Sequence, residues 1–378
     1  MRRLPAELLS EIFLYLAESD LRGYQSAKQG KMYAAHLIAT TVACVCAWWR
    51  AVALGTPRLW SRITVVEWTR HVDAYVGACI ALSRERELDI KCSAATHLPV
   101  VLAHILPHAR RWASISLCGS FDDFCAIPPL YHFVRLVSAD LVIDSEVERE
   151  VGAFEFLADA PLLRQARIHA PSVQAHHTVI LPSSWKLTFL QLDLDDVYRA
   201  RPLLAIIAQY SATLETLACT FDDKTWAAPS DETLEPISLP ALRTLELTGH
   251  SFIFLAYLTA PNTRSITVAD TDIQDAEPYT CLFTFLTRHS ALAPLPNLHR
   301  LRISEEPYHS FTKDASRALL RCLALTESLQ ELAIEFPAGS SLVLANPDAE
   351  WTRTSKLCVL WKGLTVHEGK RPTGRARF

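Results

Sequence analysis

Glycine is scarce in this sequence, at 11 of 378 residues. Phosphate-binding loops depend on glycine because their backbone must approach the phosphate closely, and the sequence contains neither Gly-x-x-x-x-Gly-Lys nor Gly-x-Gly-x-x-Gly. It also lacks His-Glu-x-x-His and Gly-x-Ser-x-Gly, the signatures of many zinc proteases and serine hydrolases. We therefore expect no catalytic residues of these types and no bound cofactor.

Strong charge and long apolar runs are missing as well. The net charge is only −4, and a nucleic-acid-binding face usually needs a clear basic excess, so we expect no nucleic-acid partner. No run reaches the ~18 uncharged apolar residues of a membrane helix; the closest, residues 37–49, ends at Arg50. Glu7 and Glu11 interrupt the segment after Arg2 and Arg3, which argues against a signal peptide.

The ten cysteines show no paired metal-binding spacing. In a chain without a secretion signal they are typical of reduced, mostly buried thiols, so a cytoplasmic and/or nuclear location is expected. Four other clusters invite a metal or redox interpretation: His176-His177, Cys44-x-Cys46, the aspartates Asp193, Asp195 and Asp196, and Asp270-x-Asp272. Adjacent histidines rarely chelate one ion, residues two apart on a helix face opposite ways, and acidic strand ends are usually solvated. We expect no metal site.

What the sequence does have is an apolar N-terminus. Residues Leu4 to Leu16 read as one helix, with Pro5 suited to the first helical position and Glu7 in the first turn. Its apolar face consists of Leu8, Leu9, Ile12, Phe13 and Leu16, flanked by Leu14 and Tyr15. A second apolar helical face, Val42, Val45, Trp49, Val52 and Ala53, follows before Gly55 and Pro57 stop the helix.

These two segments together resemble an F-box. The Leu-Pro-x-Glu-Leu-Leu-x-Glu-Ile-Phe opening and the Val45-Cys46-x-x-Trp49-Arg50 segment are similar to the two ends of that motif, and the tail from Ala53 to Trp60 is similar to fungal F-box proteins. The link at about residues 19–41 is longer than the family's usual one. The resemblance implies docking on a Skp-type adaptor, and through it on a cullin, by Leu4, Pro5, Leu8, Leu9, Ile12, Phe13, Val45, Cys46 and Trp49. Periodicity alone favours a helical cap on the following domain, and it is the specific residue order that favours an F-box.

A repeat of the form apolar-x-x-apolar-x-apolar runs through the rest of the chain. Its clearest copies begin at Leu242, Leu298 and Leu329, further copies begin at Trp112, Leu187 and Leu214, and weaker ones begin at Phe133, Leu163 and Thr263. With Leu88, about ten units follow one another at a mean spacing of about 27 residues. Helix-like segments lie between them, at Glu146–Leu157, Pro202–Ser211, Tyr279–His289 and Lys313–Thr326.

This region resembles irregular leucine-rich repeats, without the Asn or Cys that usually follows the central leucine. An ordinary α/β domain with a parallel sheet would give much the same local pattern. The expected fold is α/β, with a helical F-box-like domain at residues 1–62, a leucine-rich-repeat-like solenoid at 63–368 and a basic, disordered tail at 369–378. Residues 340–345 and 358–366 are candidate capping strands.

Three functions fit these observations. The F-box resemblance implies a non-catalytic substrate-recognition subunit of an SCF-type, cullin-based ubiquitin ligase, whose repeats bind a protein target. The alternatives are a leucine-rich-repeat scaffold without a ligase role, and an enzyme on an α/β fold, which would need an apolar pocket with convergent polar groups. The sequence names neither the target nor the residues that bind it.

Overall fold

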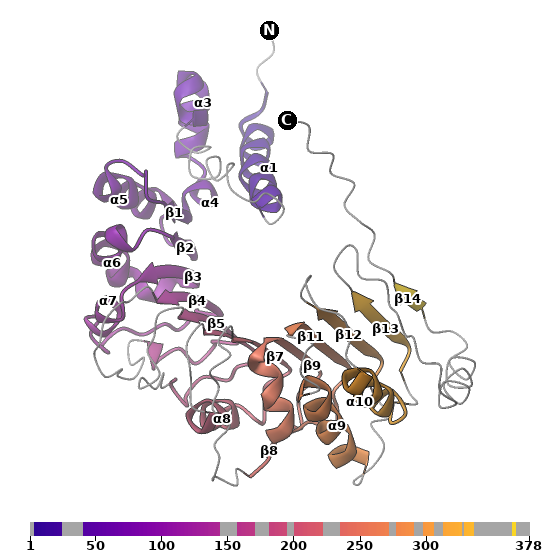
Figure 1. Ribbon diagram of the computed structural model, residues 1–378. Helices are drawn as coiled ribbons and strands as arrows, with labels where there is room; N and C mark the ends of the chain where they lie inside the picture. The colour runs from indigo at the N-terminus through magenta and orange to yellow at the C-terminus, as the bar shows by residue number, and fades with distance from the viewer. Residues whose placement is uncertain are drawn as a thin grey trace, which may run out of the picture. The chain divides into compact units, whose positions relative to one another are not determined.

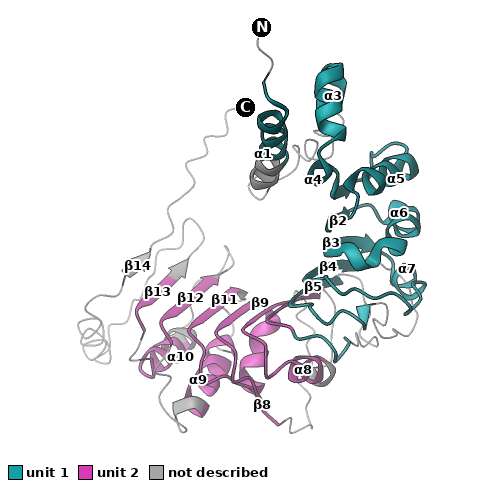
Figure 2. Ribbon diagram, turned by 180° about the vertical axis from the view of Figure 1, so that it is seen from behind, with its two compact units in different colours: residues 1–147, 151–170, 179–186 teal, residues 148–150, 171–178, 187–378 magenta. Residues whose placement is uncertain are grey.

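The computed structural model describes residues 4–24, 41–143, 157–170, 181–194, 200–221, 235–271, 277–290, 298–305, 313–326, 329–335 and 365–367. The chain forms two compact units (Figures 1 and 2). The first comprises residues 1–147, 151–170 and 179–186, and the second comprises 148–150, 171–178 and 187–378. The two units are described separately below.

The first unit begins with short helices. Helix α1 spans Ala6–Tyr24, residues 41–45 are helical, α3 spans Ala47–Leu54 and α4 spans Pro57–Trp60. The carbonyl of Pro5 accepts the first helical hydrogen bond, from the N–H of Leu9 at 3.1 Å. Helix α1 is longer than the expected Leu4–Leu16 helix, because extending a formed helix is cheap and no glycine or proline stands before Gly23.

Five parallel strands complete the first unit: β1 Arg62–Val65, β2 Leu88–Cys92, β3 Trp112–Gly119, β4 Ser138–Ile143 and β5 Gln165–Ala170. Their order in the sheet is their order in the chain. The connections include α5 Val72–Ser83, η1 Ala95–His97, α6 Leu98–Ile105, η2 Leu106–Arg111 and α7 Phe121–Cys125. Helices α5, α6 and α7 lie on one side of these strands (Figure 1).

The second unit repeats this arrangement. Its main strands are β6 Phe189–Leu194, β7 Thr216–Phe221, β9 Thr244–Gly249, β11 Ser265–Thr271, β12 Arg300–Glu305, β13 Glu331–Glu335 and β14 Thr365–His367, parallel and again in chain order. A separate parallel pair joins β8 Ile237–Ser238 to β10 Leu258–Thr259. The helical segments are α8 Ala200–Gln209, η4 His250–Tyr257, α9 Glu277–Ser290 and α10 Lys313–Leu323.

The sequence repeat corresponds to the pairing register of these strands. Its central residues pair across neighbouring strands, in the row Ile63, Ile90, Ile115, Ala139 and Ala166 and in the row Leu190, Leu217, Leu245, Ile266, Leu301 and Leu332. All of them with a described side chain are buried. Alternate residues of a strand point to opposite faces, so each copy of the pattern contributes one buried rung to the core.

Two copies of the repeat were placed wrongly. The unit counted from Leu88 has its central residue at Ile90, which pairs with Ile63 and Ile115. The pattern Phe133-x-x-Leu136 precedes the strand, and the pairing partner of Ile115 and Ala166 is Ala139. The true copy is therefore Leu136-x-x-Ala139-x-Leu141, in which alanine replaces the central leucine. Phe133 is nevertheless buried, and its ring packs 5.1 Å from that of Trp112.

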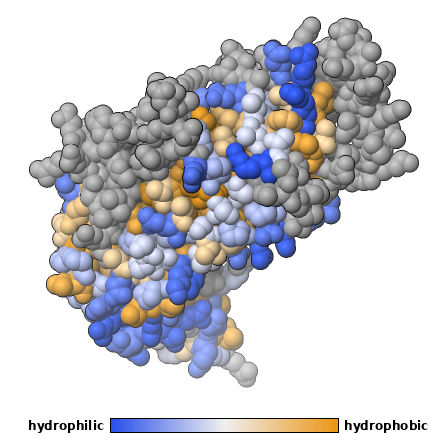
Figure 3. Space-filling model, turned by 90° about the horizontal axis from the view of Figure 1, so that it is seen from below, coloured by the Kyte–Doolittle hydropathy of each residue, from blue (hydrophilic) through white to orange (hydrophobic). Residues whose placement is uncertain are grey.

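The expected helices at 202–211, 279–289 and 313–326 correspond to α8, α9 and α10. The end of the expected 358–366 strand overlaps β14. Residues 146–156 of the expected Glu146–Leu157 helix, the expected strand at 340–345, most of the 19–41 link and the tail at 369–378 lie outside the described residues. None of the described helices is long and apolar enough to cross a membrane. On the face in Figure 3, hydrophobic residues lie among hydrophilic ones.

The cysteines divide by location. Cys79, Cys92, Cys219, Cys281 and Cys322 are buried, whereas Cys44, Cys46 and Cys125 are exposed. Cys44 and Cys46 are thus exceptions to the expectation of mostly buried thiols: Cys46 is the N-cap of α3, the one non-helical residue between two helical segments. Burial raises the pKa of the Cys79 and Cys92 thiols to about 11, and those of Cys281 and Cys322 to about 12.

This division predicts thiol reactivity. At pH 8 a thiol-specific reagent is expected to modify Cys44, Cys46 and Cys125 within minutes and to leave the five buried thiols intact, because the thiolate is the reacting form and burial suppresses it. Mass spectrometry of proteolytic peptides after a short pulse measures this, with a denatured sample as the control in which all thiols react. Modification of Cys79 or Cys322 as fast as Cys44 would contradict the described core.

Candidate docking surface

The N-terminal helices form a small core of their own. Leu9 and Phe13 on α1 are fully buried, and the ring of Phe13 lies 5.2 Å from that of Trp49 on α3. Val42, Val52 and Ala53 are buried beside them. Aromatic pairs at this separation add about 0.5–1.5 kcal/mol to the burial of their surface. Half of the apolar face of α1 is therefore used inside the protein.

Hydrogen bonds fix the corner between α3 and α4. The Thr56 hydroxyl donates to the carbonyl of Val52 at 2.7 Å and lies 3.1 Å from the Ser10 hydroxyl of α1. The indole N–H of Trp60 donates to the carbonyl of Ala53 at 2.8 Å. Gly55 ends α3, as the sequence predicts. Pro57, expected from the sequence only as a stop, begins α4. These contacts determine which face of α1 turns inward.

Removing the Thr56 hydroxyl is expected to destabilise the corner between α3 and α4. Thr56→Val keeps the shape of the side chain but deprives the Val52 carbonyl of a buried donor and Ser10 of its partner, which should cost about 1–2 kcal/mol in the free energy of unfolding. Urea denaturation of the two proteins measures the difference. Ser61→Ala, which removes an exposed hydroxyl bond to the Arg58 carbonyl, is the matched control and should change stability by less than about 0.5 kcal/mol. Equal effects of the two substitutions would contradict the role of Thr56.

The opposite face of α1 is apolar and open to solvent. We call the residues Leu4, Leu8, Ile12, Tyr15 and Leu16 the apolar stripe; the exposed fractions of Leu8 and Tyr15 are 54% and 70%. Leu8, Ile12, Tyr15 and Leu16 share one side of α1 at helical spacing, and Leu4 lies just before the helix. Exposed apolar groups on one helix face mark sites of protein contact more often than isolated exposed residues do.

The structure divides the nine residues predicted to bind an adaptor. Leu4, Pro5, Leu8, Ile12, Val45 and Cys46 are exposed, Trp49 is half-buried, and Leu9 and Phe13 are buried. Helix α1 packs on α3 and α4. Leu9 and Phe13 belong to its buried face, whereas Leu8 and Ile12 lie on the exposed face. Cys46 also accepts a weak hydrogen bond from the N–H of Trp49 at 3.4 Å and so caps α3.

Sequence reasoning did not include Tyr15 and Leu16 among the docking residues. Both are exposed and continue the apolar stripe beyond Ile12. The signal was present, since Leu4, Leu8 and Tyr15 fall on one side of a helical wheel of 100° per residue. The aromatic ring of Tyr15 is the type of side chain that contributes most to protein interfaces.

The other clusters considered from sequence form no site among the described residues. In that part of the chain no three His, Cys, Asp or Glu side chains gather closely enough to hold a metal ion. Asp193 lies on β6, where it accepts a hydrogen bond from the Gln191 amide at 3.3 Å. His176, His177, Asp195, Asp196 and Asp272 lie outside the described residues.

Comparison with known families agrees with the N-terminal geometry. The F-box-like family model matches residues 1–65. No curated protein sequence matches the chain. The chain thus carries an F-box-like domain, which comprises α1, α3, α4 and β1, and such a domain suggests an adaptor role in an SCF-type complex.

Proposed function

We propose that this protein is the substrate-recognition subunit of an SCF-type ubiquitin ligase. The observation that carries the proposal is the apolar stripe, which lies exposed on the first helix of a segment that matches the F-box-like family. An apolar helix face of this kind gains about 25 cal/mol for each Å² that a partner removes from water. The expected partner is a Skp-type adaptor, which would connect the chain to a cullin.

The parallel strands would hold the target. In the first unit Thr64, Lys91, Ser116, Asp140 and Arg167 form one row on the face opposite the buried rungs. In the second unit Gln191, Ala218, Glu246, Thr267 and Arg302 form a similar row. Within each unit the main strands follow chain order, and in the first the helices lie on one side. These features favour leucine-rich repeats over a doubly wound α/β domain, whose helices cover both faces.

The protein itself would do no chemistry in this role. It would hold a lysine of the target near a ubiquitin-conjugating enzyme, so its contribution to the reaction is proximity. No catalytic residue or cofactor is needed, and a cytoplasmic and/or nuclear location follows from where such ligases act. The tail of the F-box-like segment, from Ala53 to Trp60, favours the fungal type.

Co-purification with a cullin tests the ligase role. Tagged full-length protein, co-expressed with a Skp-type adaptor and a cullin, is expected to retain both partners in one complex during size-exclusion chromatography. A chain that retains the adaptor and excludes the cullin would instead be a repeat-based interaction scaffold. Leu8→Asp with Ile12→Asp serves as the negative control, because it should lose both partners together.

A further inference from the structure

One face of the sheet in the second unit carries small side chains. In β7, β9 and β11 every second residue points away from the buried rungs, and the parallel register places these residues side by side. None of them is buried. We call them the threonine face: Thr216, Ala218, Thr220, Thr244, Glu246, Thr248, Ser265, Thr267 and Ala269.

Glu246 occupies the centre of this face. Its strand, β9, lies between β7 and β11, and its register partners there are Ala218 and Thr267. Thr244 and Thr248 precede and follow it on the same side of β9. Neighbours lie about 4.8 Å away across the strands and about 7 Å away along them. One exposed carboxylate thus stands among short hydroxyl and methyl groups.

No positive charge adjoins this carboxylate. On β6, which pairs with β7, the same face carries Gln191 and Asp193. The nearest arginines of the face stand on β12, two strands and about 10 Å from Glu246, and one of them, Arg300, forms an ion pair with Glu331 at 2.7 Å. Among the residues that the structure describes, none forms a hydrogen bond or ion pair with the Glu246 side chain.

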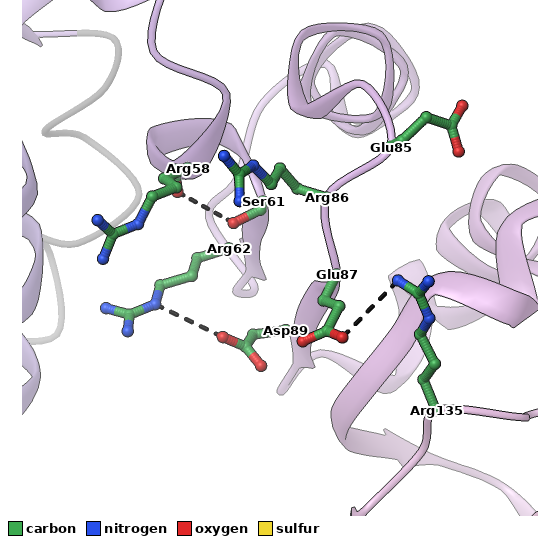
Figure 4. Close-up of a pocket in the computed structure, with 8 residues that line it drawn as sticks. All are labelled: Arg58, Ser61, Arg62, Glu85, Arg86, Glu87, Asp89 and Arg135. Atoms are coloured by element: carbon green, nitrogen blue, oxygen red, sulfur yellow. Dashed lines mark hydrogen bonds and ion pairs between the residues drawn. The ribbon is translucent and has the colours of Figure 1, made fainter.

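Carboxylates on the sheet of the first unit are placed differently. Asp140, in the middle of β4, accepts a hydrogen bond from the Ser116 hydroxyl at 3.2 Å and stands in register with Arg167 on β5. At the starts of the strands, a charged pocket of about 430 Å³ contains an ion pair of Arg62 with Asp89 at 3.6 Å (Figure 4). The central carboxylate of the threonine face has no such partner among the described residues.

This isolated charge determines the chemistry of a ligand. A carboxylate without a neighbouring cation attracts a positive group and repels an anion. A metal ion would need several oxygen ligands, and in the described part of the chain no three acidic, histidine or cysteine side chains gather closely enough to hold one. A single basic side chain needs only one carboxylate, so it matches the face better than a metal ion does.

Arginine fits these surroundings better than lysine does. Its planar guanidinium can bind a carboxylate through two N–H groups and has three further N–H donors, for which the threonine hydroxyls beside Glu246 are acceptors. Its aliphatic stem could lie on the methyl groups of Ala218 and Thr267. The ammonium group of lysine would make one point contact and leave most of these groups unused.

We propose that the threonine face binds an arginine side chain of the target protein, with Glu246 as its partner. The inference deepens the proposed function, on which it rests for the existence of a protein target. It identifies a basic segment as the part of the target that the second unit recognises. Because the attraction is electrostatic and the site is open to solvent, binding should weaken as the salt concentration rises.

Methyl NMR tests this proposal on the full-length chain, with isotope labels in the alanine and threonine methyl groups. The probe is the capped pentapeptide Gly-Ser-Arg-Ser-Gly. Matched peptides carry lysine, or citrulline, which has the shape of arginine without its charge. At equal concentrations the arginine peptide is expected to shift the signals of Ala218, Thr267 and Ala269 at least fivefold more than the citrulline peptide does, and more than the lysine peptide does.

A charge-removing variant and its control complete the experiment. Glu246→Gln keeps the size of the side chain and should reduce these shifts at least fivefold. Glu67→Gln removes the same charge from an exposed position in the first unit and should leave them unchanged. Both side chains are exposed, so the methyl spectra of the free variants should otherwise match that of the wild type, which verifies that they are folded.

Three results would overturn the inference: no shift with the arginine peptide, equal shifts with the citrulline or the lysine peptide, or undiminished shifts in Glu246→Gln. The same protein samples are tested for adaptor binding. A chain that binds the adaptor but not the arginine peptide refutes the arginine site and leaves the proposed function standing. A chain that binds the peptide through Glu246 but not the adaptor refutes the ligase role instead.

Discussion

Leu8→Asp combined with Ile12→Asp is expected to reduce binding of a Skp-type adaptor by at least about 100-fold. Both side chains lie exposed in the apolar stripe, and a docked partner would have to bury two carboxylates in place of two apolar groups. Central interface residues typically contribute about 2 kcal/mol or more each, so the loss of two gives this magnitude. Titration calorimetry or a quantitative pull-down measures it.

The same double substitution should leave the protein folded. Neither side chain belongs to the core, and the cost in the free energy of unfolding is about 1 kcal/mol, from the lower helix propensity of aspartate. Val100→Asp is the matched control, since Val100 is an exposed apolar position on another helix, α6. It should retain full adaptor binding. Undiminished binding of the double variant would show that the apolar stripe is not the docking surface.

Phe13→Ala is expected to act through stability instead. Phe13 is completely buried against Trp49, and truncating such a residue to alanine costs about 3–5 kcal/mol because it removes apolar contact and leaves a cavity. The helices of the F-box-like domain should then open far more often, and adaptor binding should fall with them. Hydrogen exchange resolves this effect: amides of α1 and α3 should exchange faster, and those of β3 and β4 much less so.

A conservative replacement provides the control for Phe13. Phe13→Leu keeps most of the apolar volume and should lose less than half as much stability, with adaptor binding largely retained. If Phe13→Ala weakened adaptor binding without any change in exchange at α1, the residue would be a direct contact, and the division of α1 into a buried and an exposed face would be wrong.

Much of the fold follows from local sequence pattern. Alternating apolar residues recur at each strand, and the central residues of the copies, such as Leu217, Leu245 and Leu301, prove to be neighbours in the sheet. The pattern failed at β4, where Ala139 stands in the central position and the stronger apolar pair Phe133 and Leu136 lies outside the strand. A small residue at a buried rung gives no hydrophobic signal.

The division of α1 into two faces was not predictable from its sequence. Leucine occurs on both faces, and large apolar residues such as Ile12 and Phe13 are neighbours in the chain but lie on different faces, so periodicity outlines one broad apolar region. Leu9 and Phe13 are buried by tertiary contact, whereas Leu8 and Ile12 stay exposed. Phe13 packs against Trp49, and Ser10 of α1 lies within hydrogen-bond distance of the Thr56 hydroxyl. The resemblance to the F-box motif indicated the docking residues as a group but did not separate the buried ones from the exposed ones.

The pocket that is lined by Arg58, Arg62, Arg86 and Arg135 (Figure 4) could not be predicted from the sequence, for a different reason. Arg58, Arg86 and Arg135 belong to three separate connections, and no spacing in the chain relates them. Their proximity depends on the parallel order of β1, β2, β3 and β4, which brings the starts of these strands to one edge. Such sites become visible only when the strand order is known.

Co-expression of the full chain with a Skp-type adaptor, followed by size-exclusion chromatography with light scattering, tests the central claim most directly. We predict a soluble complex with one copy of each protein, which the Leu8→Asp, Ile12→Asp variant fails to form. A well-folded chain that elutes alone, with the adaptor in a separate peak, would contradict the account. The N-terminal helices would then serve only to cover the first strand of the sheet.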